Sequence, residues 1–466
     1  MPTTLIGVFG YVLVQLGIGL YVSRRIRTED DYLIAGRQLG YGLGTFTIFA
    51  TWFGAETCIG AAGAIYEQGL SGGTADPFGY GVCLLLMGFV FAVPLWRHKL
   101  TTLADLFRRR YSAGVERLAV VLMVPTSLLW AAAQVRAFGQ VLSASSGLEL
   151  SLTISLAALV VIAYTIFGGL LADAWTDLIQ GLAMAVGLVV LVVVVLRDVG
   201  LEAVTAIDPA RLSVVGSADV PWLLIVEDWA IPICGSVMAA ELVARVIATR
   251  SPQVARRSTL MAGGLYLALG GIPVLIGLLG FTLVPDLTHP EQILPAVARQ
   301  YLSPLLYTLF AGALVSAILS TVDSALLVAS SLVSHNLLVP LRPGLSEAGK
   351  VWLARAGVAV FGVLAYVMAL FADGVYALVE EASAFGSAGI FIVILFGLFT
   401  GIGGAMTAYA TLLAGVGCWI LGAYVLALPY PYVTSLAAAL LTYGVAAAIE
   451  HRREPVASGI GRPQAP

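Results

Sequence analysis

Residues 313–336, ALVSAILSTVDSALLVASSLVSHN, form an apolar segment of membrane-spanning length that also carries hydroxyl groups and one carboxylate. Ala317, Ser320 and Thr321 are spaced i, i+3 and i+4, so they share one face of a helix. Unpaired polar groups are costly in hydrocarbon, so a lipid-facing helix would not carry such a face. A small hard cation such as Na⁺ needs several oxygens in place of its water. This helix therefore predicts half of an ion site in a secondary transporter.

The composition places the whole chain in a membrane. Of its 466 residues, 59% are hydrophobic and 11% are charged, and the mean hydropathy is +0.96. A soluble protein of this size would carry roughly a quarter charged residues. We expect an all-α polytopic membrane protein whose partners are the lipid bilayer and a small organic solute, with no nucleic acid; the oligomeric state stays open. The HExxH and CxxC motifs of metal-dependent and redox enzymes are absent from the sequence, and we expect no enzyme.

About thirteen apolar runs of spanning length divide the chain. We expect a leading transmembrane helix and cytoplasmic linker (1–41), a ten-helix transport core (42–400), two trailing transmembrane helices (401–449) and a cytoplasmic tail (450–466). Basic residues follow the first, third, seventh, ninth and last runs, all on one side if the count holds. The positive-inside rule then puts the N-terminus outside and the C-terminus in the cytoplasm, in a multi-pass protein of the plasma (inner) membrane.

Two of these runs are interrupted in corresponding positions. Run 42–66 carries Gly54 and Gly60 around Glu56, and run 221–248 carries Pro232 and Gly235. The two lie five spans apart, and paired broken helices are typical of inverted-repeat transporters that bind substrate and ion near the breaks. The alternative is that these residues only kink packed helices.

Several motifs resemble the sodium:solute symporter family, over roughly residues 30–400. They are YLIAGRQLG (32–40), GGLLADAWTDLIQ (168–180), ARVIATRSPQVARR (244–257) and AILSTVDSALL (317–327). ILPAVARQYLSP (293–304) and ATW (50–52) are similar to the high-affinity choline transporter-like branch. The resemblance implies a LeuT-type fold of two inverted five-helix repeats with one leading and two trailing helices. It also implies uptake of a small organic solute by alternating access, with Na⁺ as coupling ion and no other cofactor.

The resemblance also implies the ligands of the sodium site. Three backbone carbonyls and two hydroxyls would bind Na⁺, a set that suits a hard cation: those of Ala50, Phe53, Ala317, Ser320 and Thr321. The alternative is that the hydroxyls only bond back to carbonyls four residues earlier. Some relatives bind a second cation, and the matching residues here are Asp177, Asp323 and Ser324. Asp177 could instead anchor the helix that follows the Gly168–Gly169 turn.

An aromatic cage for an ammonium group is implied by the choline-transporter branch. Three of its positions match Trp52, Tyr80 and Trp130, whereas the fourth, a tryptophan in that branch, aligns with Ala239. Gln134 is a further candidate. The departure at position 239 puts choline itself in doubt.

Charged residues near the expected pocket leave the substrate class open. Glu56 in the first break, with Glu381 and Ser383 in run 375–399, favours a cationic or zwitterionic amine. Arg136 is a candidate carboxylate clamp, or it forms an ion pair with Glu56 or Glu381 that only joins helices. We favour a choline-, betaine- or amino-acid-like solute. A sodium-coupled monocarboxylate symporter, or a solute sensor without net transport, is the alternative.

Arg245 is expected to pair with Glu241 or to close an inner gate.

Overall fold

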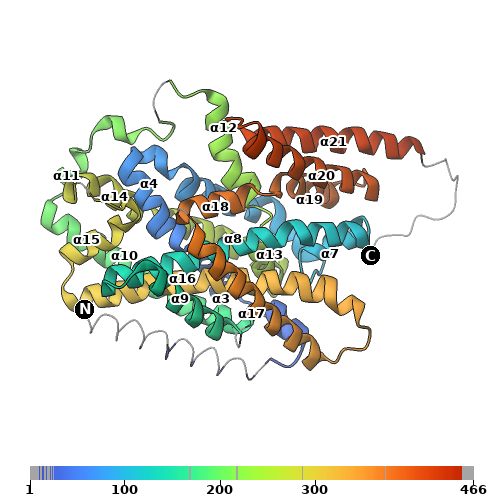
Figure 1. Ribbon diagram of the computed structural model, residues 1–466, viewed down its shortest axis with the longest axis horizontal. Coiled ribbons are helices and arrows are strands. Elements are labelled where there is room, and N and C mark those ends of the chain that lie inside the picture. The colour runs from blue at the N-terminus through green and yellow to red at the C-terminus, as the bar shows by residue number, and fades with distance from the viewer. Residues whose placement is uncertain are drawn as a thin grey trace.

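The computed structural model describes residues 26–453 except 167–168, 217–218, 286 and 373, together with six isolated positions between residues 10 and 24. Most of the expected leading helix, and the tail beyond residue 453, lie outside the described residues. The described chain is helical and includes no strand, only an isolated bridge between Leu39 and Thr249 (Figure 1). The prediction of an all-α fold is confirmed. Within the described residues, eight helices are long and apolar enough to cross a membrane, or up to ten if each bent pair counts as one span.

The first five-helix unit starts with a broken helix. It comprises α3 (Tyr41–Trp52), η2 (Glu56–Ala61) and α4 (Ala62–Gln68); then η4 (Thr74–Gly79), α5 (Tyr80–Leu86), η5 (Met87–Phe91) and α6 (Ala92–Arg97); then α8 (Ala113–Ser146), α9 (Leu150–Thr165) and α10 (Leu170–Val199). Two short helices, α2 (Glu29–Ile34) and α7 (Ala104–Arg110), lie in the segments before α3 and before α8.

The second unit repeats this order. It comprises α12 (Trp222–Ala230), η7 (Ile231–Gly235) and α13 (Ala240–Ile247); then α14 (Pro252–Leu283), α16 (Pro304–Val333) and α17 (Glu347–Phe371); then α18 (Val375–Ala384) and α19 (Ser387–Phe399). The η8 turn (Pro290–Gln292) and α15 (Ile293–Tyr301) connect α14 to α16, and η9 (Ser334–Leu338) follows α16. The trailing helices are α20 (Ala405–Ile420), followed by η11 (Leu421–Val425), and α21 (Pro431–Arg453).

Helix α16, which carries the segment quoted first, lies at the centre of the bundle. Every residue from Phe310 to Leu332 is buried, and the helix packs against α8, α10 and α3. Its hydroxyls therefore face protein and not lipid, as the cost of exposing them to hydrocarbon requires.

Three of the described membrane helices are broken or bent. Residues 53–55 separate α3 from η2, and residues 236–239 separate η7 from α13 with a bend of 41°. The glycine and proline residues within these apolar runs indicated both. A third bend, of 42°, lies between α18 and α19, where Gly386 adopts a φ of +66°. Glycine tolerates this left-handed conformation because it has no Cβ, and the apolar run around it gave no sign of the bend.

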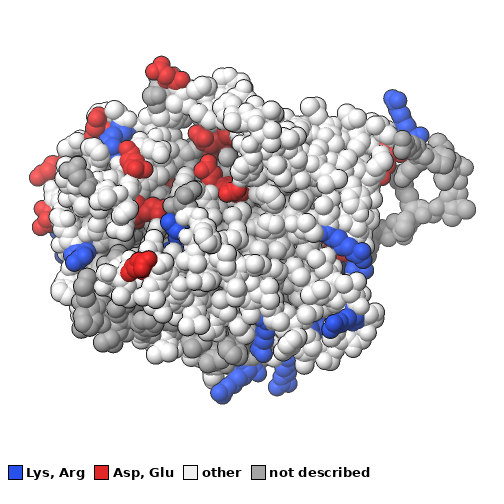
Figure 2. All heavy atoms as spheres, viewed as in Figure 1, with Lys and Arg blue, Asp and Glu red and all other residues white. Residues whose placement is uncertain are grey.

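One end of the bundle is formed by the loops that carry most of the basic residues, and we call it the basic end. Hydrogen bonds join these loops: Arg37 donates to the carbonyls of Ile247 and Leu100, and the amide of Arg250 donates to the carbonyl of Leu39. Figure 2 shows a group of blue basic residues along the bottom and lower right, whereas most red acidic groups lie at the upper left, with a few basic ones among them.

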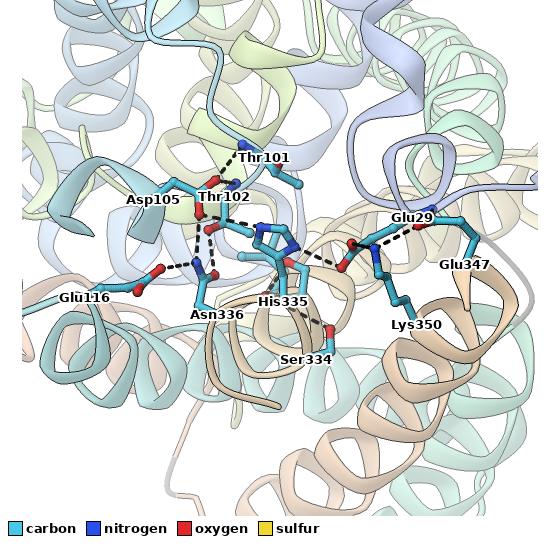
Figure 3. Close-up of polar contacts among 12 residues, drawn as sticks. Glu29, Thr101, Thr102, Asp105, Glu116, Ser334, His335, Asn336, Glu347 and Lys350 are labelled. Carbon is cyan, nitrogen blue, oxygen red and sulfur yellow. Dashed lines mark hydrogen bonds and ion pairs between the residues drawn. The ribbon is translucent and has the colours of Figure 1, made fainter. Parts of the chain in front are cut away.

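A polar network at the basic end joins α2, α7, α8 and η9 (Figure 3). The His335 Nδ1 atom lies 2.9 Å from a carboxylate oxygen of Glu29. The Asn336 amide donates to Asp105 over 2.9 Å and to Glu116 over 2.8 Å. Burial alone raises the pKa of Asp105, but hydrogen bonding and charge from His335, together with two backbone amides, leave that pKa below its usual value.

Candidate functional site

The first break is stabilised by two buried side chains. A carboxylate oxygen of Glu56 accepts from the amide of Gly54 over 3.2 Å, and the carbonyl oxygen of Gln134 accepts from the amide of Ala55 over 3.0 Å. The Gln134 amide in turn donates to Glu56 over 2.7 Å. These contacts satisfy amide groups that the interrupted helix leaves without helical partners. The carbonyls at the end of α3 are thereby free to bind something else.

Three of the five expected sodium ligands converge at this break. The Thr321 hydroxyl lies 3.4 Å from the carbonyl oxygen of Ala50 and 3.2 Å from that of Ala317. A Cβ added to Gly54 would lie only 2.5 Å from the Thr321 Oγ1 atom, so the break and α16 touch here. The Ala317 contact is the local back-bond of the alternative interpretation, but the Ala50 contact joins two helices. All these residues are buried.

The other two expected ligands are Phe53 and Ser320. Phe53 terminates α3 with a non-helical backbone (φ −91°, ψ 74°). The Ser320 hydroxyl donates to the Asp177 carboxylate, which also accepts from Thr47 over 2.5 Å. Asp177 thus lies one hydrogen bond from the expected sodium ligands, and both of its bonds join α10 to helices of that site.

The remaining residues of the expected second cation site have other contacts. Asp323 accepts from Thr165 of α9. The Ser324 hydroxyl accepts from the Arg245 guanidinium, which also forms a buried ion pair with Asp173. The expected Arg245–Glu241 pair is therefore wrong: the fold brings Asp173 of α10 to the guanidinium instead.

The three aromatic residues form one buried cluster. The rings of Trp52 and Tyr80 stack with centroids 5.7 Å apart, and Trp130 lies 5.4 Å from Trp52 and 5.9 Å from Tyr80. Trp52 stands between the expected ligands Ala50 and Phe53, so this cluster adjoins the sodium site. The Trp52 indole N–H is buried and has no hydrogen-bond partner among the described residues.

Ser383 lies at the edge of the aromatic cluster. Its hydroxyl is 2.8 Å from the Tyr80 hydroxyl and accepts from Ser236 over 3.1 Å. Ser236 belongs to the second break, so both breaks contribute to one site. The sequence offered no signal for Ser236 beyond its position next to Gly235.

Two expected substrate residues lie outside the cluster. Arg136 donates to the carbonyl of Ala369 on α17 over 3.1 Å, and Glu381 accepts from Tyr424 of η11. The helical repeat explains both placements, since residues six apart, as Trp130 and Arg136 are, point about 120° away from each other. Glu381 and Ser383, two apart, point about 160° away from each other.

A cavity of about 390 Å³ lies at the end opposite the basic end. Four carboxylate side chains line it and no lysine or arginine does: Glu67, Asp228, Glu291 and Glu380. Gly60 and Tyr376 also line it, which places the cavity next to η2 of the first break. Figure 2 shows acidic groups gathered on this side of the molecule. Its negative field favours the approach of cations.

Comparisons with known proteins agree with this geometry. Residues 32–415 match the model of the sodium:solute symporter family. Human high affinity choline transporter 1 is 30% identical over 402 residues, which are 80% of this chain and 69% of that protein. The sodium/pantothenate symporter of Escherichia coli (strain K12) is 26% identical over 350 residues, 72% of each chain. A solved Na⁺-coupled sialic acid symporter superposes with a TM-score of 0.84 at 19% identity, over 96% of this chain and 97% of that one. The expected family, choline-transporter branch and inverted-repeat fold are confirmed.

Proposed function

The chain belongs to the sodium:solute symporter family and is a sodium-coupled symporter of a small organic solute; we propose that the solute is an amine or zwitterion bound at the Trp52–Tyr80–Trp130 cluster. The observation that carries this proposal is the position of the three rings, directly beside the expected sodium ligands. An acidic cavity lies next to η2 of the same break. Aromatic faces attract an ammonium group, most strongly where water is excluded.

The sodium ion would bind to the carbonyls of Ala50, Phe53 and Ala317 and the hydroxyls of Ser320 and Thr321. The convergence of Thr321 with two of these carbonyls supports this ligand set. Because Trp52 follows one ligand residue and precedes another, ion binding would order the backbone that positions its ring. This shared backbone would couple the two sites.

Two features favour a zwitterion over choline. The unpaired indole N–H of Trp52 needs an acceptor, and the charged carboxylate of a zwitterion would accept this hydrogen bond more strongly than the neutral hydroxyl of choline. Ala239, where the choline-transporter branch has tryptophan, begins α13 at the second break and adds no fourth ring. Arg136, which contacts α17, gives no specific support to a monocarboxylate.

We propose that the basic end faces the cytoplasm and the acidic cavity faces outward in the plasma (inner) membrane. The joined basic loops support this orientation through the positive-inside rule. The cavity would then be the entrance for solute, and the bonds between Arg37, Leu39 and the end of α13 would close the inner end.

Uptake into liposomes tests the proposal. Purified protein would be given an inward Na⁺ gradient and a panel of labelled choline, glycine betaine, proline and lactate. We expect accumulation of an amine or zwitterion and its competition by other members of that class. Accumulation of lactate alone would identify a monocarboxylate symporter, and binding without accumulation would identify a sensor.

A further inference from the structure

A buried arginine lies beside the expected sodium site. Arg245 on α13 is fully buried, and its Nη2 atom contacts the Asp173 carboxylate and the Ser324 hydroxyl. The Ser324 Oγ atom lies 3.3 Å from the Thr51 hydroxyl and 2.9 Å from the carbonyl oxygen of Ser320. The guanidinium therefore lies among carboxylate, hydroxyl and carbonyl oxygens. This is the type of ligand set that a hard cation would use.

The two carboxylates of α10 in this region are compensated if Arg245 counts as one cation and Na⁺ as the other. Asp173 and Asp177 lie one turn apart on α10, and both are buried. Two carboxylates that stay ionised out of water need two positive charges, because an uncompensated buried charge is costly. Arg245 pairs with Asp173. Asp177 bonds to Ser320, so one Na⁺ at the Ser320–Thr321 site would compensate it.

Some polar atoms of this cluster have no hydrogen-bond partner among the described residues. They are the Nε and Nη1 atoms of Arg245 and one carboxylate oxygen of Asp173. A pair whose only role was to join helices would be expected to use more of these donors and acceptors. Glu241, one turn before Arg245, makes no ion pair with it in the described part of the chain.

We propose that the guanidinium of Arg245 is a tethered cation in the place of a second coupling ion, so that the protein binds a single Na⁺. This inference rests on the proposed sodium site. It changes the interpretation of the second cation site expected from the sequence. Ser324 and the carboxylates of α10 form a cation site, and the guanidinium of Arg245 is the cation that occupies it.

Equilibrium binding of ²²Na⁺ to the purified full-length protein, counted per molecule, tests the inference. The wild type should bind one Na⁺. Arg245→Met leaves two buried carboxylates with one mobile cation and should bind two. The double variant Arg245→Met/Asp173→Asn removes one charge of each sign and should return to one. Arg257→Met, which removes an exposed guanidinium from α14, is the matched control and should bind one.

Each outcome separates the inference from the function on which it rests. A wild type that binds two Na⁺ would overturn the tethered cation and leave sodium coupling intact. A folded Arg245→Met protein that still binds one Na⁺ would show that the Arg245–Asp173 ion pair only stabilises the fold, and it would overturn the inference. A wild type that binds no Na⁺ would overturn the proposed sodium site as well. If Arg245→Met does not fold, the wild-type count and the double variant decide: two Na⁺ in either contradicts the inference.

Discussion

Gly54 offers a steric test of the sodium site. In a Gly54→Ala protein the new methyl group would lie 2.5 Å from the Thr321 Oγ1 atom, 2.8 Å from the Glu56 carboxylate and 3.0 Å from the Gln134 carbonyl oxygen. The Thr321 hydroxyl must retreat by about 0.9 Å or more to restore an ordinary contact. That retreat withdraws one ligand from the ion.

The expected loss follows from the strength of one such contact. An interaction between a charge and a neutral polar group contributes about 1.5–3 kcal/mol, and about 1.4 kcal/mol corresponds to a factor of ten. We therefore expect the Na⁺ midpoint of Gly54→Ala to rise about 10- to 100-fold. Trp52 lies between two ligand residues, so a sodium titration of tryptophan fluorescence is a suitable assay.

Two further variants make this test specific. Gly42→Ala adds the same methyl group to the same helix, where nothing lies within 4 Å, and should leave the midpoint unchanged. Gly54→Ala added to Thr321→Ala should raise the midpoint much less than it does in the wild type, because both changes remove one ligand. Full additivity of the two changes, or an unchanged midpoint in Gly54→Ala, would refute the reasoning.

Three other predictions concern the solute, Arg136 and the basic end. Trp130→Leu should weaken binding of an amine solute about 5- to 30-fold, which corresponds to the loss of about 1–2 kcal/mol of cation–π attraction. Trp130→Phe should retain most of the affinity. Equal affinities of the wild type and Trp130→Leu in competition assays would show that Trp130 does not bind the solute. Arg136→Gln should lower the melting temperature in detergent and preserve uptake, since the guanidinium contacts a carbonyl of α17 away from the aromatic cluster. Selective loss of uptake of carboxylate-bearing solutes would support the carboxylate clamp. The lowered pKa of Asp105 means that its carboxylate stabilises the fold above its ordinary pKa, a contribution lost as the pH falls below about 4. Asp105→Asn should thus lower the melting temperature near neutral pH and flatten its fall in acid; parallel melting curves for the two proteins against pH would contradict this.

The sequence predicted features that depend on local spacing. The i, i+3 and i+4 positions of Ala317, Ser320 and Thr321 indicated a polar helix face, and Gly54 and Pro232 indicated the two breaks. These inferences hold because helical geometry fixes which neighbours share a face.

Contacts between distant segments were beyond such reasoning. Arg245 and Asp173 are 72 residues apart in the chain, so the local rule favoured Glu241. Glu56 was expected to bind solute, yet its carboxylate accepts from the amide of Gly54, a contact that depends on the path of the backbone through the break. Arg136 lies near Gln134 in the sequence, but the helix turns it toward α17.

Sodium-driven accumulation by the wild type and a Ser320→Ala/Thr321→Ala variant tests the central claim most directly. In liposomes with an inward Na⁺ gradient, the wild type should concentrate its solute above the external level, and an equal K⁺ gradient should drive nothing. The variant, with carbonyl ligands left but both hydroxyls removed, should lose accumulation while remaining folded. Undiminished accumulation in K⁺, or in the variant under Na⁺, would contradict a coupling ion bound between the first break and α16.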